Sequence, residues 1–341
     1  MLSSSFLSAA FGKFDEGREM AKAVQLLLDK PGMQHKKSFG LFILECFIYH
    51  WTSPLQGTLA PLLEGYQAGL ETGDVERAGL NLVARSSTLW YSGRNLEGLQ
   101  VELQTYINVL AQLNLESSRM DVLAYLLAVK KLRGTYNAEE DDDFEAILQV
   151  AADTGNKSLR VFAMTLQLEL LVFDNEWKSA TSLLLEVTPE DLASAVGMFI
   201  VVRFTFMDAL VSLKKAQLTT TTWLEKRKWK RRGVKSLKTL QGWAKKGNPN
   251  VVHSIHLVTA ELAVLKHNKT EAEKNFKSVT TIAAKNGFLQ DKALAHQLAG
   301  QYFTSQGDQY WANYHKECSQ KAFLDWGATT KVEEANMRHN D

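Results

Sequence analysis

The sequence GDQYWA at residues 307–312 has the spacing G-D-x-x-x-A, and the same spacing recurs as GDVERA at residues 73–78. Glycine adopts the left-handed conformation that ends a helix, and aspartate can accept hydrogen bonds from the free N–H groups of the next helix. A small alanine one turn later lets the two helix backbones approach closely. Each copy therefore predicts a helical hairpin.

Helical periodicity extends outward from these turns. Apolar residues lie at helical spacing over 257–265 and 272–279, and again over 294–303 and 309–324. The segment FDNEWKSA at 173–180 is a weaker copy that lacks the glycine. Four helical pairs with a period of about 40 residues predict an all-α fold, a helical solenoid in which each pair buries its apolar face against its neighbours.

We expect one continuous repeat array over residues 1–341, with loops near 134–143 and 247–250. The first loop contains the acidic run EEDDD, and the second contains the sequence GNPN. A globular helical bundle is the alternative, but a bundle does not require a recurring turn signature. The absence of proline between Leu62 and Thr188 also favours helices.

The composition is that of a protein with a buried core, with 45% hydrophobic and 23% charged residues in a chain of 341. The net charge is +1, so it identifies no partner. Cys46 and Cys318 form no CxxC pair and are expected to be reduced thiols, which predicts a cytoplasmic location. The most apolar window, 192–213, contains Arg203 and Asp208, so we predict a buried helix there and no transmembrane segment.

Six segments of the chain are, in order, WTSPL at 51–55, LAPLLEGY at 59–66, GLETGD at 69–74, AEL at 260–262, AHQLA at 295–299 and WGA at 326–328. They resemble the tetratricopeptide-like repeat region of multidomain sensory kinases, and this resemblance implies a right-handed α-α superhelix of the tetratricopeptide-like type. In that family an AAA-type ATPase module follows a serine/threonine-kinase-like domain, the helical repeats come next, and many members continue into a histidine kinase domain. The resemblance covers about residues 11 to 334.

The resemblance implies protein partners, among them kinase or ATPase modules. The resemblance does not imply ATPase or kinase activity for this chain. The chain has no G-x-x-x-x-G-K-[ST] loop, no HRD or DFG motif and no phosphoacceptor histidine box. Lys316 and Ser319 stand where the family usually has apolar or small residues. We therefore expect a non-enzymatic protein-protein interaction scaffold in signal transduction, without catalytic residues or a cofactor.

The strongest local feature is the basic sequence KRKWKRR at 226–232. Between residues 214 and 246 the chain has twelve Lys or Arg and one acid, Glu225. Such a segment is either a solvated helix face or a contact for an anionic partner, nucleic acid or acidic lipid, and we do not expect nucleic acid to be the main partner. The candidate contact residues for this alternative function are Lys226, Arg227, Lys228, Lys230, Arg231 and Arg232.

Two other residue pairs have the residue types of a chemical site. His253 and His256 lie three residues apart, but they lack a third close ligand, so we predict no metal site. Cys46 and His50 are four residues apart, and this spacing alone does not make a catalytic dyad.

Aromatic residues at helical spacing, among them Trp90, Trp311 and Trp326, are expected to pack between stacked helices rather than to line a ligand site. The binding surface of such a superhelix is expected to be its concave face. Helix faces there form a groove that can accept a peptide or a partner helix.

Overall fold

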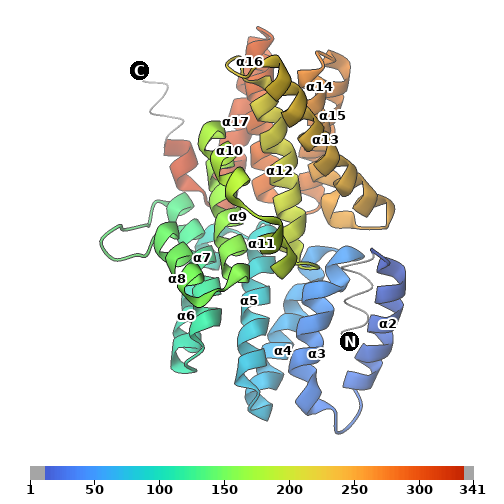
Figure 1. Cartoon of the computed structure of the whole chain (residues 1–341), viewed down its shortest axis with the longest axis vertical. Helices are drawn as coiled ribbons and strands as arrows, with labels where there is room; N and C mark the ends of the chain where they lie inside the picture. The colour runs from blue at the N-terminus through green and yellow to red at the C-terminus, as the bar shows by residue number, and fades with distance from the viewer. Residues whose placement is uncertain (1–11, 334–341) are drawn as a thin grey trace.

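The computed structural model describes residues 12–333, which form helices joined by turns and short connections (Figure 1). No strand occurs among these residues, which confirms the predicted all-α fold. The α-helices are α2 (Phe14–Leu28), α3 (Gln34–Phe47), α4 (Leu59–Thr72), α5 (Val75–Tyr91), α6 (Leu96–Gln112), α7 (Glu116–Arg133), α8 (Phe144–Thr154), α9 (Lys157–Phe173), α10 (Trp177–Glu186), α11 (Pro189–Ser194), α12 (Phe199–Gln217), α13 (Trp223–Lys245), α14 (Val252–Leu265), α15 (Lys269–Lys285), α16 (Leu289–Ser305) and α17 (Gln309–Trp326). Three short 3-10 helices are η1 (Tyr49–Trp51), η2 (Leu55–Thr58) and η3 (Pro249–Val251).

The two G-D-x-x-x-A segments form the predicted hairpin turns. Gly73 and Gly307 have φ angles of +75° and +74°, which glycine adopts without strain. Asp308 caps α17, since its carboxylate accepts a hydrogen bond from the Trp311 N–H at 3.2 Å. Asp74 occupies the same position before α5, but its side chain makes no capping hydrogen bond. The turn geometry therefore depends on the glycine more than on the aspartate.

Asparagine replaces glycine in the weaker copy at 173–180. Asn175 has a φ angle of +61° between the end of α9 and the start of α10. Asn114, between α6 and α7, has a φ angle of +57°. Asparagine tolerates the left-handed conformation better than most residues. Asparagine therefore takes the place of glycine at these two turns.

The apolar window 192–213 is not one helix. Its first residues end α11, a turn that includes Gly197 at φ +89° follows, and α12 begins at Phe199. The expectation of a single buried helix is corrected in this respect, because the positive φ of Gly197 interrupts the helical backbone. Helix α12 itself is almost entirely buried, as predicted.

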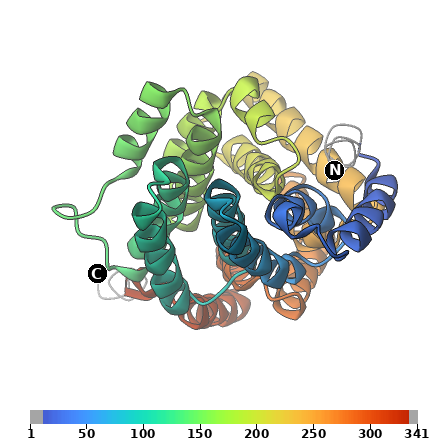
Figure 2. The same cartoon turned by 90° about the horizontal axis from the view of Figure 1, so that it is seen from below.

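Successive helices pack side by side, with α4 on α5, α6 on α7, α12 on α13, α14 on α15 and α16 on α17. A row of inner helices runs through the molecule, in which α3, α5, α7, α9, α12, α14 and α16 each contact the next. Seen from below, the helices of the N-terminal half follow an arc around α5 (Figure 2).

The two halves of the chain also contact each other directly. The Trp90 and Trp326 rings lie 5.6 Å apart between centroids, and the Asn95 side chain donates to the Asp325 carbonyl at 3.1 Å. Thr330 donates to the carbonyl of Leu132 at 2.9 Å. Contacts are therefore not limited to helices adjacent in sequence, which goes beyond the nearest-neighbour packing expected of an open repeat array.

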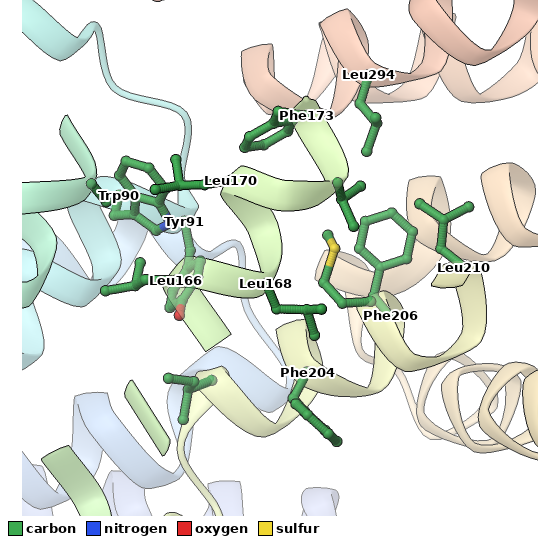
Figure 3. Packing of buried hydrophobic residues seen from close by; sticks show 14 of the residues in the cluster. Trp90, Tyr91, Leu166, Leu168, Leu170, Phe173, Phe204, Phe206, Leu210 and Leu294 are labelled. Atoms are coloured by element: carbon green, nitrogen blue, oxygen red, sulfur yellow. The ribbon is translucent and has the colours of Figure 1, made fainter. Parts of the chain in front are cut away.

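Helix α9 lies at the centre of this packing (Figure 3). Leu166 and Leu170 lie toward Trp90 and Tyr91 of α5, while Leu168 lies toward α12. These side chains belong to one continuous hydrophobic core that reaches from Phe14 of α2 to Trp326 of α17. The centre of the molecule is filled in this way, so the candidate binding sites lie around this core.

Candidate interaction surfaces

The basic segment forms α13, which begins with a capping box. Thr222 accepts a hydrogen bond from the Glu225 N–H, and the Glu225 carboxylate accepts one from the Thr222 N–H at 3.1 Å. The Thr222 hydroxyl and the Thr222 N–H both donate to the Glu225 carboxylate, and these two hydrogen bonds lower the pKa of Glu225. One face of α13 is buried against α12, where a Cβ on Gly233 would lie 2.9 Å from Leu213 Cγ. Helix α13 is thus held on the body of the protein by its apolar face.

The structure separates Arg232 from the other five predicted contact residues. Its guanidinium pairs with the carboxylate of Asp208 on α12, which also accepts a hydrogen bond from Ser236. Its Cζ also lies 5.6 Å from the centre of the Trp229 ring. Arg232 therefore has a structural role, in fixing α13 to α12.

The remaining basic residues lie toward solvent. Arg227, Lys228 and Arg231 are exposed, whereas Lys226 and Lys230 are half-buried. The exposed row continues through Lys235 and Lys238 at helical spacing. Within residues 12–333 the exposed members of this row have no ion pair at 4.0 Å or less.

Two exposed apolar side chains precede this row. Trp223 and Leu224, at the start of α13, are each 69% exposed. Arg227 lies over the Trp223 ring, with its Cζ 5.9 Å from the ring centre. The exposed face of α13 therefore combines positive charge with an aromatic surface, a combination that suits anionic partners.

A groove lies between the end of α9 and helices α16 and α17. It has a volume of about 570 Å³. Small residues such as Gly300 and Ala312 form part of its lining, and the Phe173 and Phe323 rings form another part. The charged residues of the lining are Asp174, Lys316 and Lys331. Its polar residues include six carboxamides, namely Asn175, Gln297, Gln301, Gln309, Asn313 and Gln320.

Hydrogen bonds hold several of these carboxamides in place. Gln297 donates to the Phe173 carbonyl at 3.1 Å, and Gln301 donates to the Asn175 side chain at 2.7 Å. On α17, Gln309 donates to Asn313 at 2.7 Å. A carboxamide has two donor hydrogens and an oxygen acceptor, so each can still bind the N–H and C=O groups of an extended peptide.

Trp311 is not packed between helices, so the prediction for the aromatic residues is wrong at this position. Its side chain is 43% exposed on α17, near the exposed rings of Tyr310 and Tyr314. Trp90 and Trp326, in contrast, are buried as predicted. Position 319, where the chain departs from the family pattern, is also buried, and Ser319 donates to the Ala293 carbonyl at 3.0 Å.

A cluster of charged residues lies at the centre of the molecule. Arg203 on α12 binds Glu169 on α9 at 2.7 Å, and His253 on α14 donates to Asp291 on α16 at 2.8 Å. Burial by itself would raise the pKa of Asp291, but Arg203 and His253 lower it to about 2. All four residues are at most 2% exposed. A substrate has no access to such a cluster, so its role is to hold helices together.

The fold does not assemble a chemical site from the His253 and His256 pair or around Cys46. His256 binds Asn275 at 2.8 Å, away from the Asp291 partner of His253. In the described part of the chain no three His, Cys, Asp or Glu side chains are arranged so that they could hold a metal ion. Burial raises the pKa of the Cys46 thiol to about 12, which makes it a poor nucleophile.

Comparison of the chain with protein-family models, with curated proteins and with solved structures gave no match. The resemblance to the repeat region of sensory kinases therefore stays a prediction. Within residues 12–333, none of the helices has the length and hydropathy that a bilayer-spanning segment needs.

Proposed function

We propose that this chain is a non-enzymatic protein-protein interaction scaffold in cytoplasmic signal transduction. In this proposal the helices form a right-handed, tetratricopeptide-like superhelix, and the partners are kinase or ATPase modules. The carboxamide-lined groove between α9, α16 and α17 carries the proposal. We infer that it binds an extended segment of a partner through the main chain of that segment.

Three properties of the groove support a peptide ligand. Its volume of about 570 Å³ lies within the range of known ligand sites. The carboxamides on α16 and α17 repeat at the spacing of a helical turn, as Gln297 and Gln301 or Gln309 and Asn313 do. Neutral amides match peptide groups in both donor and acceptor capacity. Of the three charged residues in the lining, Lys331 pairs with Asp174, and Lys316 adds one further positive charge.

Affinity capture with matched variants tests this function. The full chain is used as bait in extract of its native cells, at about physiological salt, and captured proteins are identified by mass spectrometry. The test variant carries Gln309→Ala and Asn313→Ala. The control carries Gln104→Ala and Asn108→Ala, because these exposed amides on α6 have the same spacing and the same type of hydrogen bond.

We expect kinase or ATPase chains to be captured by the wild type and the control and lost with the groove variant. Capture of such chains by all three proteins would place the contact outside the groove. Capture of no signalling protein by the wild type would contradict the scaffold function.

The basic face of α13 favours a second candidate function, binding of an anionic partner. The exposed row of positive residues next to Trp223 supports it. The test variant is Lys228→Glu with Arg231→Glu and Lys235→Glu, which leaves the Arg232–Asp208 ion pair intact. We expect binding of the wild type to vesicles that contain phosphatidylserine, with a steep loss as salt rises, and no binding of the variant. Equal binding to neutral vesicles, or binding only to single-stranded RNA, would exclude the lipid form of this function.

A further inference from the structure

A second cavity lies between the inner helices of the N-terminal half and is separate from the groove discussed above. It has a volume of about 250 Å³ and is lined by residues of α3, α5, α7 and α9 and by the start of α12. His50 closes one side, where its Nε2–H donates to the Gly197 carbonyl at 2.8 Å. Exposed or half-buried side chains, among them Ser117 and Asn156, line it as well and give it a route to solvent.

Two buried carboxyl groups line this cavity without a partner. Glu45 on α3 is 5% exposed and Asp121 on α7 is 9% exposed. Neither forms an ion pair within residues 12–333, and Asp121 Oδ1 is a buried atom without a hydrogen bond. Buried carboxyl groups in folded proteins are nearly always paired, because an unpaired buried charge is strongly unfavourable. Two such groups in one cavity point to a ligand that supplies the missing partners.

No positive side chain in the lining balances these acids. The described residues around the cavity include no Lys or Arg. Burial lowers the pKa of His50 to about 4, so its imidazole is neutral. Burial also raises the pKa of Glu45 to about 8 and that of Asp121 to about 7, as expected for carboxyls without a cation nearby. A ligand with a carboxylate or phosphate group would find no counterion here.

The rest of the lining is suited to hydrocarbon. Leu55, Val83 and Ile200 contribute aliphatic surface, and Phe42 and Phe162 contribute aromatic rings. A metal ion alone does not fit, because no group of three potential ligands occurs in the described chain and the hard divalent cations need several oxygens. The volume of about 250 Å³ lies below the range of roughly 300–1,000 Å³ found for drug-sized ligands, so the cavity suits only a small molecule.

We propose that this cavity binds a small aliphatic diamine, whose two ammonium groups are bound by Glu45 and Asp121 and whose methylene chain lies on the apolar lining. Each carboxylate then accepts charge-assisted hydrogen bonds from an ammonium group. Because the ligand has no anionic group, the lack of Lys and Arg in the lining does not oppose its binding. The site is independent of the groove between α16 and α17, so the two proposals can fail separately.

Isothermal titration calorimetry of the full chain tests this proposal. The ligands are diaminopropane, diaminobutane and diaminopentane at constant ionic strength. The controls are butylamine, which has one charge, and ornithine, which adds a carboxylate to a diamine. We expect saturable binding of at least one diamine, with both controls weaker by about tenfold or more.

The isosteric variants Glu45→Gln and Asp121→Asn identify the carboxyl groups that bind. Each is expected to weaken diamine binding by about tenfold or more. Both remove a buried carboxyl without changing its volume, so neither should lower the thermal stability of the free protein at pH 8. In the wild type, diamine binding should release protons at pH 6.5, because Glu45 and Asp121, whose pKa values are raised, ionise when the ammonium groups bind. For the same reason, the affinity for the diamine should increase between pH 6 and 8.5.

Three results would overturn the proposal. The first is the absence of saturable binding of every diamine to the wild type at concentrations up to about 10 mM. The second is butylamine binding as tightly as the best diamine, and the third is undiminished diamine binding in both variants.

Discussion

Arg203 on α12 and Asp291 on α16 form a two-pronged ion pair, in which the Nη1–Oδ2 and Nη2–Oδ1 distances are 2.7 Å and 3.1 Å. The same guanidinium binds Glu169 on α9, and Glu169 accepts a hydrogen bond from Trp90 of α5 at 2.8 Å. One arginine thus connects helices that come from both halves of the chain. Burial, partly offset by Arg203, raises the pKa of Glu169.

Replacement of Arg203 by methionine should destabilise the protein strongly. The variant Arg203→Met leaves Asp291 and Glu169 buried without their cation, which typically costs about 3–5 kcal/mol. The free energy of unfolding can be measured by urea denaturation. The matched control is Arg231→Met on the exposed face of α13, which should change it by less than about 0.5 kcal/mol. A loss below about 1 kcal/mol for Arg203→Met would show that the cluster is not a major support of the fold.

The lowered pKa of Asp291 predicts a defined acid sensitivity. A carboxyl with a pKa of about 2 in the folded state, and about 3.9 when unfolded, stabilises the fold fully above pH 4. This contribution is lost as the pH falls from about 4 through 2. In Asp291→Asn the slope of unfolding free energy against pH should therefore be smaller in this window. The same slope in both proteins would mean that Asp291 does not bind Arg203 as a carboxylate.

Truncation of the central tryptophan should be far more damaging than truncation of a surface one. Trp326 is 0% exposed, and its ring lies 5.5 Å from that of Phe173. We expect Trp326→Ala to lower the free energy of unfolding by about 3–5 kcal/mol. Trp223→Ala, at a position that is 69% exposed, should have an effect below about 0.5 kcal/mol. Similar losses in the two variants would contradict the packing at the centre of the molecule.

Adjacent arginines of α13 should respond differently to charge reversal. Arg232→Glu places a second carboxylate beside the buried Asp208 and should destabilise the protein by about 2 kcal/mol. Arg231→Glu changes an exposed residue and should leave the melting temperature almost unchanged. Thermal unfolding of the two purified variants makes the comparison. A lower melting temperature for Arg231→Glu than for Arg232→Glu would contradict the orientation in which α13 packs on α12.

The helical class and several turns could be predicted because their determinants are local. Gly307 and Asp308 specify a turn within a few residues, and the structure has that turn. The ion pair between Arg203 and Asp291 joins residues 88 positions apart, and no local pattern predicts which acid an arginine will meet. A signal did exist, however, since an arginine within an apolar stretch requires a buried acid somewhere in the fold.

The same reasoning applies to the diamine cavity. Glu45 lies in the apolar sequence LFILECFI at 41–48, and an acid in such a run either has a buried partner or lines a site. The sequence does not show that Asp121, from a different helix, lines the same cavity. The groove could not be predicted for a similar reason, because its carboxamides come from the turn after α9, from α16 and from α17, and they converge only after the halves of the chain have packed together.

Site-specific photo-crosslinking at Asn313 tests the scaffold function most directly. A photoreactive amino acid replaces Asn313 in the groove and, in a parallel protein, Asn108 on α6, and crosslinked peptides from irradiated native cells are sequenced. We predict that Asn313 captures one recurrent segment of a kinase or ATPase chain that Asn108 does not capture, and that a synthetic copy of this segment binds the purified protein. N-methylation of its peptide groups should abolish that binding, since the carboxamides contact the main chain. Identical crosslinks at both positions, or undiminished binding of the N-methylated peptide, would contradict the proposed function of the groove.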